Sequence, residues 1–174
     1  MVGCGVYLQG RIAVNVSARQ LIHPDFLKKI ELLLEETNCN PEWIELEITE
    51  SSILENPQKT INLLGKLRDK GFHISMDDFG TGYSSMSYLK NLPIHKLKID
   101  QSFIRNIEAE PKNQLIVKTI IALAKGLEIE VLAEGVETIE ELDLLNLYGI
   151  DSIQGYYYHK PMPLKEIELL LQSN

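Results

Sequence analysis

The chain has 174 residues, of which 44% are hydrophobic and 24% charged, and its formal net charge at pH 7 is −8. This composition is typical of one globular domain, long enough to bury a core without disulfide or metal staples. The acidic balance excludes a bare surface for duplex DNA or RNA, because phosphates need lysine and arginine to neutralise them. An acidic protein can still bind a phosphate ligand if metal cations lie between the two.

Cysteine content and hydropathy indicate a cytoplasmic protein. The two cysteines, Cys4 and Cys39, are too few for a disulfide framework and match no zinc motif. A reducing compartment is therefore the expected location. Lys118 and Lys125 interrupt the most apolar stretch, so no run reaches the ~18 residues of a membrane span. We expect no membrane segment in this chain.

Short β-branched runs alternate with segments of helical periodicity along the chain. In chain order, the sequence predicts a strand at 12–16, a helix at 25–37, a strand at 43–49, a helix at 57–70, strands at 73–77 and 95–99, a helix at 112–126, a strand at 130–134, a helix at 138–148, a strand at 151–154 and a helix at 165–172.

Several helix boundaries have a physical signature. Asn56 and Pro57 open one helix as cap and first residue. Thr138 and Glu141 have the spacing of a capping box. We expect the acidic residues on the helices, Glu141 included, to lie on solvated faces.

The strand–helix alternation predicts an α/β fold of parallel strands joined by right-handed crossovers. An open doubly wound sheet and a TIM-type (β/α)8 barrel both fit. Polar residues follow almost every strand, as on the carboxyl-end face of a barrel, whereas an open sheet gathers them at one switch point. Barrels typically exceed ~200 residues, so we expect an incomplete barrel of about six β/α units.

Oxygen donors and one lysine mark the ends of the predicted strands. These candidates are Asn15, Glu47, Asp77, Asp78, Lys98, Asp100, Glu134, Glu137 and Gln154. So many carboxylates in one pocket repel each other unless protons or cations neutralise them. Oxygen ligands suit Mg²⁺, Mn²⁺ or Ca²⁺. The adjacent Asp77 and Asp78 suit two close ions, as in phosphoester hydrolysis.

Each candidate also has an ordinary structural interpretation. Asn15 and Gln154 are residue types common in turns, and Asp77-Asp78 before a glycine is a plausible helix cap. Lys98 alternates with apolar residues, as a solvent-facing strand residue does. Only the complete set, spaced along successive strands, favours a functional site.

Six segments, taken together and in order, resemble the successive signatures of the EAL domain family. They are NVSARQL, LEITES, DDFGTGYSS, LKIDQSF, AEGVET and QGYYYHKPMP, and they run from about Asn15 to Pro163. The resemblance implies a hydrolase that converts cyclic-di-GMP to the linear dinucleotide pGpG, with two Mg²⁺ or Mn²⁺ ions. It also implies bacterial second-messenger signalling in the cytoplasm, with cyclic-di-GMP as the ligand.

The resemblance assigns a role to each matching residue. Asn15, Glu47, Asp77 and Asp78 correspond to metal ligands, and Lys98 and Glu134 to catalytic residues at the attacking water. Gln154, Asp100 and Glu137 correspond to residues around the metal-bound waters or the substrate. Glu50 and Thr81 correspond to residues that stabilise the loop at 78–85. That loop, together with exposed barrel edges, is where the resemblance implies a homodimer contact.

The sequence departs from the family pattern at its start. Only fourteen residues precede Asn15, and none reads as the Glu-Ala-Leu segment that supplies a further metal ligand in the family. We therefore expect residues 1–174 to form a single EAL-type domain that lacks its first strands and helix, with two unpaired sheet edges. Impaired hydrolysis is one expectation. A module that binds cyclic-di-GMP or a protein without turnover, or a poorly folded remnant, are the alternatives.

Overall fold

The structure, a computed structural model, describes residues 10–81 and 89–172. Its elements in chain order are β1 (Ile12–Asn15), α1 (Ala18–Ile22), α2 (Phe26–Thr37), the 3₁₀ turn η1 (Pro41–Trp43), β2 (Ile44–Thr49), α3 (Glu50–Leu54), α4 (Pro57–Asp69), β3 (His73–Phe79), β4 (Lys96–Ile99), α6 (Gln101–Ile104), the 3₁₀ turn η2 (Ile107–Ala109), α7 (Pro111–Gly126), β5 (Glu130–Glu134), α8 (Ile139–Tyr148), β6 (Ser152–Gln154) and α9 (Leu164–Gln172).

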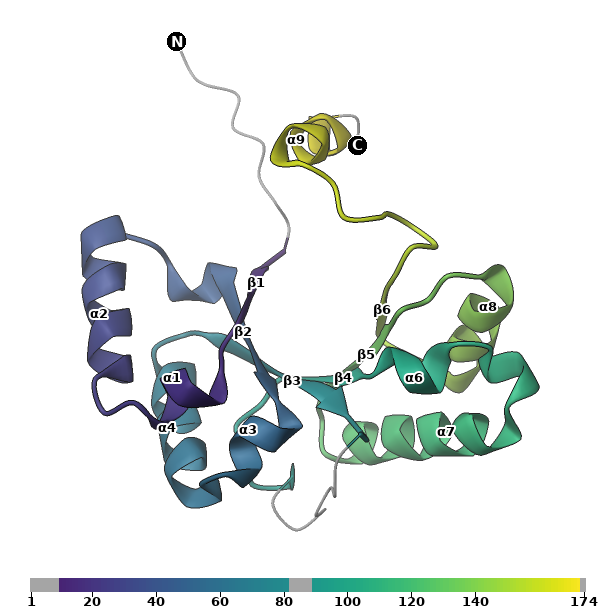
Figure 1. Cartoon of the computed structure of the whole chain (residues 1–174), viewed down its shortest axis with the longest axis horizontal. Helices are drawn as coiled ribbons and strands as arrows, with labels where there is room; N and C mark the ends of the chain where they lie inside the picture. Colours follow the sequence, from purple (N-terminus) through teal and green to yellow (C-terminus); the bar gives the residue numbers. More distant parts are fainter. Residues whose placement is uncertain (1–9, 82–88, 173–174) are drawn as a thin grey trace.

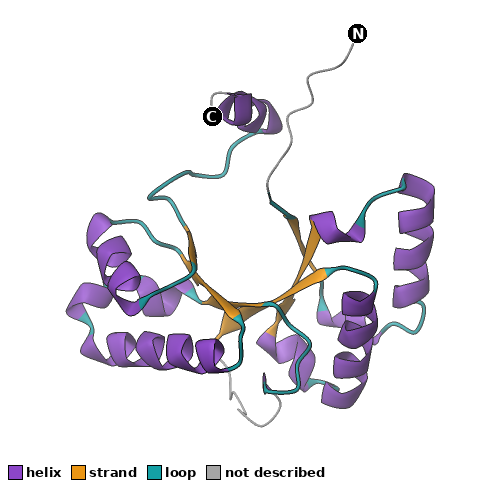
Figure 2. Ribbon diagram, turned by 180° about the vertical axis from the view of Figure 1, so that it is seen from behind, coloured by secondary structure: helices purple, strands orange, loops and turns teal. Residues whose placement is uncertain are grey.

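The six strands form one parallel sheet in the order β1-β2-β3-β4-β5-β6. The sheet curves into an arc, and the helices between strands lie outside the arc (Figures 1 and 2). This arrangement is half of a TIM-type barrel and confirms the predicted fold class. Helix α9 lies apart from the others, beyond the extended segment that follows β6 (Figure 1).

All six predicted strands and all five predicted helices are confirmed, with ends displaced by at most two residues. The short helices α1, α3 and α6, each close behind a strand, were not predicted. Ser17 caps α1 through a capping box with Gln20, and Thr49 and Asp100 cap α3 and α6 with their side chains. Each helix is one turn long, too short to show an apolar period.

The hydrophobic core lies between the convex face of the sheet and the helices. Every second residue of the strands points outward into it, including Leu46, Ile48, Ile74, Met76, Leu97, Ile99, Val131 and Ala133. Helices α4 and α7 meet these residues with Leu64, Leu67, Val117, Ile121 and Ala124. The apolar residues of the strands therefore pack against the helices, and the residues between them point to the inner face of the sheet.

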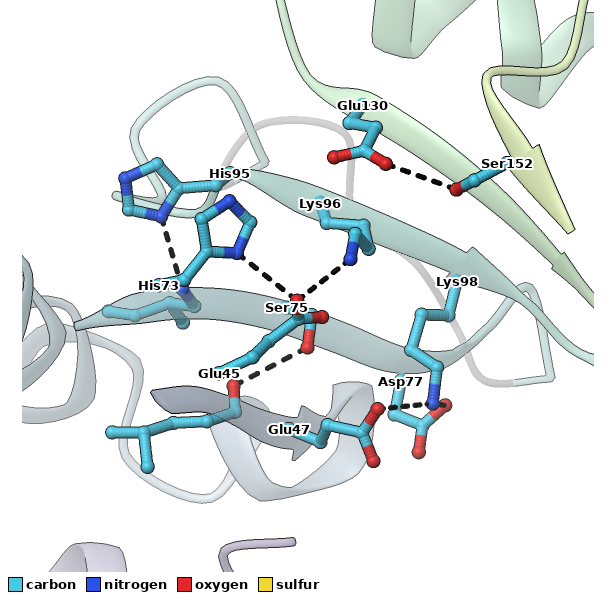
Figure 3. A network of polar contacts seen from close by, with 12 residues as sticks. Glu45, Glu47, His73, Ser75, Asp77, His95, Lys96, Lys98, Glu130 and Ser152 are labelled. Carbon is cyan, nitrogen blue, oxygen red and sulfur yellow. Dashed lines mark hydrogen bonds and ion pairs between the residues drawn. The ribbon is translucent and has the colours of Figure 1, made fainter. Parts of the chain in front are cut away.

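The alternate positions give the concave face a polar lining, unlike the branched apolar layers that usually fill such a barrel. The side chains are Glu45, Glu47, His73, Ser75, Asp77, Lys96, Lys98, Glu130, Glu134, Ser152 and Gln154. Several of them pair across neighbouring strands (Figure 3). Lys96 Nζ lies 2.7 Å from Glu45 Oε2, and Ser152 Oγ donates to Glu130 Oε1 over 3.1 Å.

One expectation about the helical acids was wrong. Glu141 is only 3% exposed, and its carboxylate accepts hydrogen bonds from the backbone N–H groups of Asn106, Glu137 and Thr138. The predicted capping box with Thr138 is present. The same carboxylate therefore caps α8 and holds η2 against it, which explains why a charged group is buried there.

The first strand lies at an edge of the sheet. Within the described residues β1 pairs only with β2, and Ile12 and Val14 remain 58% and 43% exposed. The expected unpaired, apolar edge is therefore present. In the described ranges 10–81 and 89–172, no helix combines the length and apolar character that crossing a bilayer requires.

The turn after β6 packs directly on the turn after β5. A Cβ atom added to Gly155 would lie 2.1 Å from the backbone oxygen of Val136. Val136 N also donates to Gln154 O over 3.2 Å, and Tyr157 N donates to Val136 O over 3.0 Å. Only glycine permits this approach, which fixes the ends of β5 and β6 beside each other.

We expect Gly155→Ala to lower the free energy of unfolding by about 1–3 kcal/mol or more, because the new methyl group overlaps backbone atoms. The control is Gly65→Ala within α4, where an added Cβ meets nothing within 4 Å. That change should instead stabilise the protein by about 0.5–1 kcal/mol, through helix propensity. Urea unfolding of both variants measures the contrast, and a neutral Gly155→Ala would contradict the packing described.

Glu45 should make stability depend on pH. Burial alone raises its pKa, but hydrogen bonds and charge from His73 and Lys96 outweigh burial and lower it from 4.5 to about 2. The stability it contributes is therefore complete above about pH 4.5 and is lost as the pH falls towards 2. Urea unfolding between these values should show a shallower pH dependence in Glu45→Gln than in the unmodified chain. The exposed Glu42→Gln is the control, and equal slopes in all three proteins would contradict the pairing.

Candidate active site

A buried lysine gathers three carboxylates where the central strands end. Lys98 Nζ lies 2.7 Å from Glu47 Oε1, 3.2 Å from Asp77 Oδ1 and 2.8 Å from Glu134 Oε1. Lys98 lies on β4, and the three carboxylates lie on β2, β3 and β5. All four side chains converge on the inner face of the arc, where Figure 3 shows Lys98, Glu47 and Asp77. Lys98 is only 3% exposed, which excludes the interpretation as a solvent-facing strand residue.

Burial and mutual charge set the protonation of this cluster. Burial alone would lower the pKa of Lys98, but the hydrogen bonds that its ammonium donates to Glu134 and Glu47, with the charges of Glu134 and Asp77, raise it above its usual value. Burial raises the pKa of Glu134, and the charges of Asp77 and Glu47 add to the rise, while Lys98 opposes it. The lysine is therefore firmly charged, and the carboxylates around it still carry an excess of negative charge.

A bulge in β3 brings a further carboxylate to the same place. Consecutive strand residues normally point to opposite faces, yet ligand atoms of Asp77, Asp78 and Glu134 all lie within 4.8 Å of one another. The pairing of β3 with β4 shifts register between Met76 and Phe79, and Asp78 has a φ of 57°. Aspartate tolerates this left-handed conformation, and the bulge redirects its side chain.

The bulge also gives Asp78 an unusual electrostatic setting. Burial raises its pKa, and the neighbouring charges of Asp77 and Asp100 add to the rise. Its backbone N–H donates to Asp77 Oδ1 over 3.0 Å. Three oxygen donors at this spacing, with negative charge in excess, fit a hard divalent cation such as Mg²⁺ or Mn²⁺.

Asn15 and Gln154 flank the cluster on the outer strands. Asn15 is the register partner of Glu47, and Gln154 is the register partner of Glu134. Register partners in a parallel pair point to the same face, so both amides face the concave side. Both residues are exposed.

The remaining predicted residues lie around this group. Glu50 is 2% exposed and accepts a hydrogen bond of 3.4 Å from the backbone N–H of Gly80. Thr81 Oγ1 donates to Asp78 O over 2.9 Å. Both contacts hold the chain directly after the bulge, and the wider loop-stabilising role of these two residues stays a prediction.

Asp100 and Glu137 have other contacts in this structure. Asp100 caps α6, where its Oδ1 accepts from Ser102 N over 2.9 Å. Glu137 Oε1 lies 3.4 Å from Arg105 Nη2 at the surface. The negative charge of Asp100 still influences the cluster, because it raises the pKa of Asp78. No contact between Glu137 and the four clustered side chains is present among the described residues.

The predicted dimer contact through the loop at 78–85 stays a prediction, since residues 82–88 lie outside the described part of the chain. Sequence reasoning also missed the second polar layer, in which Glu45, His73 and Lys96 lie one layer from the cluster on the same face. The signal was present, because Glu45 and Lys96 stand two residues before Glu47 and Lys98.

Fold and site together define a β/α half-barrel protein with a cluster of oxygen donors at the carboxyl ends of its strands, three of which are spaced so that they could hold a metal ion. The chain belongs to the EAL domain family, whose model matches residues 6–161.

Curated relatives agree with this assignment. The chain is 42% identical over 157 residues to the signaling protein YkoW of Bacillus subtilis, covering 90% of this chain and 20% of YkoW. It is 40% identical over 163 residues to the cyclic di-GMP phosphodiesterase NbdA of Pseudomonas aeruginosa, covering 94% of this chain and 21% of NbdA. The chain thus spans about a fifth of the length of these relatives.

Solved structures share the fold. A complex of the PaMucR phosphodiesterase with c-di-GMP superposes with a TM-score of 0.86 at 38% identity, covering 90% of this chain and 64% of that one. Klebsiella pneumoniae BlrP1, in a manganese and cyclic-di-GMP complex, gives a TM-score of 0.79 at 32% identity, covering 87% of this chain and 39% of that one.

We expect Lys98→Met to destabilise the metal-free protein by about 3 kcal/mol, because three largely buried carboxylates lose the one cation that contacts them in the described part of the chain. Manganese should restore more stability to this variant than to the unmodified chain, since a divalent ion replaces the missing positive charge. Urea unfolding in EDTA and in Mn²⁺ measures both effects.

The matched control is Lys96→Met, which removes the partner of Glu45 in the second layer. It should also be destabilised, but without the larger response to manganese. An equal response to manganese in the two lysine variants would contradict a cation site next to Lys98.

Proposed function

We propose that this chain is the phosphodiesterase domain of a second-messenger system and hydrolyses cyclic-di-GMP to pGpG. The observation that carries the proposal is the convergence of Glu47, Asp77 and Glu134 on Lys98, with Asp78 turned to the same point by the bulge. Family membership and relatives whose names state a cyclic-di-GMP phosphodiesterase or a c-di-GMP complex support it.

In this proposal the metal ligands are Asn15, Glu47, Asp77 and Asp78, and the expected cofactor is two Mg²⁺ or Mn²⁺ ions. When bound, such ions supply a nucleophile at neutral pH and neutralise the phosphodiester. The excess of carboxylates supports this part, because the negatively charged substrate would otherwise be repelled from the acidic inner face. A manganese complex of a related structure supports the choice of metal.

The protein's own groups position the reaction. Lys98 is held rigidly by three carboxylates, so its charge stays at one place where it stabilises negative charge that develops on the phosphate. Glu134, whose pKa burial raises above the usual value of a carboxylate, is in this proposal the proton acceptor beside Lys98. Gln154 lies beside Glu134 and orients water or substrate. In this proposal Asp100 and Glu137 influence the site from a distance, without direct contact with the clustered side chains.

Glu50 and Thr81 serve the site indirectly. Their contacts to Gly80 and Asp78 fix the chain after the bulge, and so hold the Asp78 carboxylate at the cation site. We further propose that residues 1–174 act as one domain, in the cytoplasm, where the free thiol of Cys39 stays reduced.

The test is incubation of the purified chain with cyclic-di-GMP and Mn²⁺, with chromatography to detect pGpG. We expect turnover that Asp77→Asn lowers more than about 100-fold, because even residues behind a metal ligand commonly contribute 10–100-fold. Glu108→Gln, an exposed carboxylate on η2, is the charge-matched control and should retain activity.

Calorimetry with the same ligand separates the two classes of function. Binding of cyclic-di-GMP without pGpG formation would overturn the enzymatic proposal and support a non-catalytic recognition module. Neither binding nor turnover by a chain that melts cooperatively would overturn both.

A further inference from the structure

A second polar pocket lies at the opposite end of the strands from the Lys98 cluster. It has a volume of about 510 Å³, and its walls include Arg11, Arg68, His73 and His95. Arg11 precedes β1, Arg68 lies in the last turn of α4, His73 begins β3, and His95 comes directly before β4. The pocket is therefore built from the amino ends of the same strands whose carboxyl ends carry the acidic site.

The two arginines supply positive charge that the neighbouring residues leave largely unneutralised. Both are exposed, and neither takes part in an ion pair with another residue in the described ranges. Among the described wall residues, Glu42 is the one carboxylate. Glu45, which lies just inside, is already paired with Lys96 at 2.7 Å. The described wall of the pocket thus carries two arginines and one carboxylate.

His95 adds a neutral donor whose tautomer is fixed. The backbone N–H of Ile74 donates to His95 Nδ1 over 3.1 Å. Because Nδ1 accepts, the ring proton of the neutral form is on Nε2, which lies on the side of the ring away from that bond (Figure 3). The ring stacks on His73, with centroids 4.3 Å apart and planes inclined by 21°, so its orientation is held.

The local charge is consistent with an anion site. Burial lowers the pKa of His95, and the charges of His73, Arg68 and Arg11 lower it further, while the charge of Glu45 opposes the fall. A positive environment that disfavours another positive charge favours a negative ligand. Arginine forks and an imidazole N–H offer more donors than one carboxylate accepts, and they match the several oxygens of a phosphate group.

We propose that this pocket binds a small phosphate-bearing molecule through Arg11, Arg68 and His95. Its volume falls in the usual range for small-ligand sites, about 300–1,000 Å³, so it accommodates a phosphorylated compound as well as the free ion. The site is separate from the proposed active site and needs no metal, because its charge is already positive.

The experiment is titration of the 174-residue chain with inorganic pyrophosphate and, separately, with guanosine monophosphate. EDTA is present throughout, so that the carboxylate cluster offers no cation to a phosphate. The ¹H–¹³C resonances of the His95 ring report local binding, and calorimetry reports the dissociation constant. Tighter binding of the nucleotide would identify the organic phosphate as the ligand, and equal binding would identify the phosphate group alone; both support the site.

Arg68→Gln and Arg11→Gln should each weaken binding about tenfold, the loss expected for one charge-assisted contact. Lys112→Gln, an exposed lysine on α7, changes the net charge equally and should have no effect. Glu42→Gln should tighten binding, since it removes the acid on the wall. A thermal melt of each variant confirms folding.

Two outcomes would overturn the proposal. One is titration to millimolar ligand without a saturable shift of His95. The other is a loss of affinity in Lys112→Gln as large as in the arginine variants, which would show that only the overall charge matters.

Discussion

The structure of the inner face depends on the burial of one charged group, the ammonium of Lys98. A buried lysine is tolerated only when opposite charges surround it. Three carboxylates meet this need, and each comes from a different strand. The four side chains reach one point because the strands are parallel, their ends are level and the sheet curves inward. The burial of this ammonium group therefore requires the order, direction and curvature of the central sheet.

Because successive strand residues point to opposite faces, the residues that pack the core and the residues of the candidate site lie on different faces of the sheet. The outward residues pack on α4 and α7 in a dry core, and the inward residues carry almost all of the charge. Changes on one face therefore leave the packing of the other largely intact. The exception is β3, where the bulge puts two consecutive acids on the inner face. The left-handed backbone conformation of Asp78 is energetically unfavourable, and the rigid strands on both sides hold it in place.

Much of the fold and of the candidate site could be predicted from the sequence, because strands with an apolar face and polar ends leave a clear pattern. The convergence of Glu47, Asp77 and Glu134 followed from the parallel order alone. Asp78 was predicted at the same place, but the bulge that turns its side chain there was not, because a bulge is a matter of register, which depends on pairing with β4. Ser17 and Gln20 carried the signal for α1, yet a one-turn helix has no periodicity to confirm it. The burial of Glu141 could not be predicted, since it depends on Asn106, the residue before η2, which lies 35 residues away from it along the chain.

The open arc has a consequence for the strength of these interactions. The side chains of Asp77 and Glu134 remain 15% and 20% exposed, so solvent on the open side of the arc partly weakens their attraction to Lys98. Any element that extended the sheet beyond β1 or β6 would narrow the arc and exclude part of this water. The attraction between Lys98 and its carboxylates, and their hold on any cation, would rise together without the movement of a single residue in the cluster.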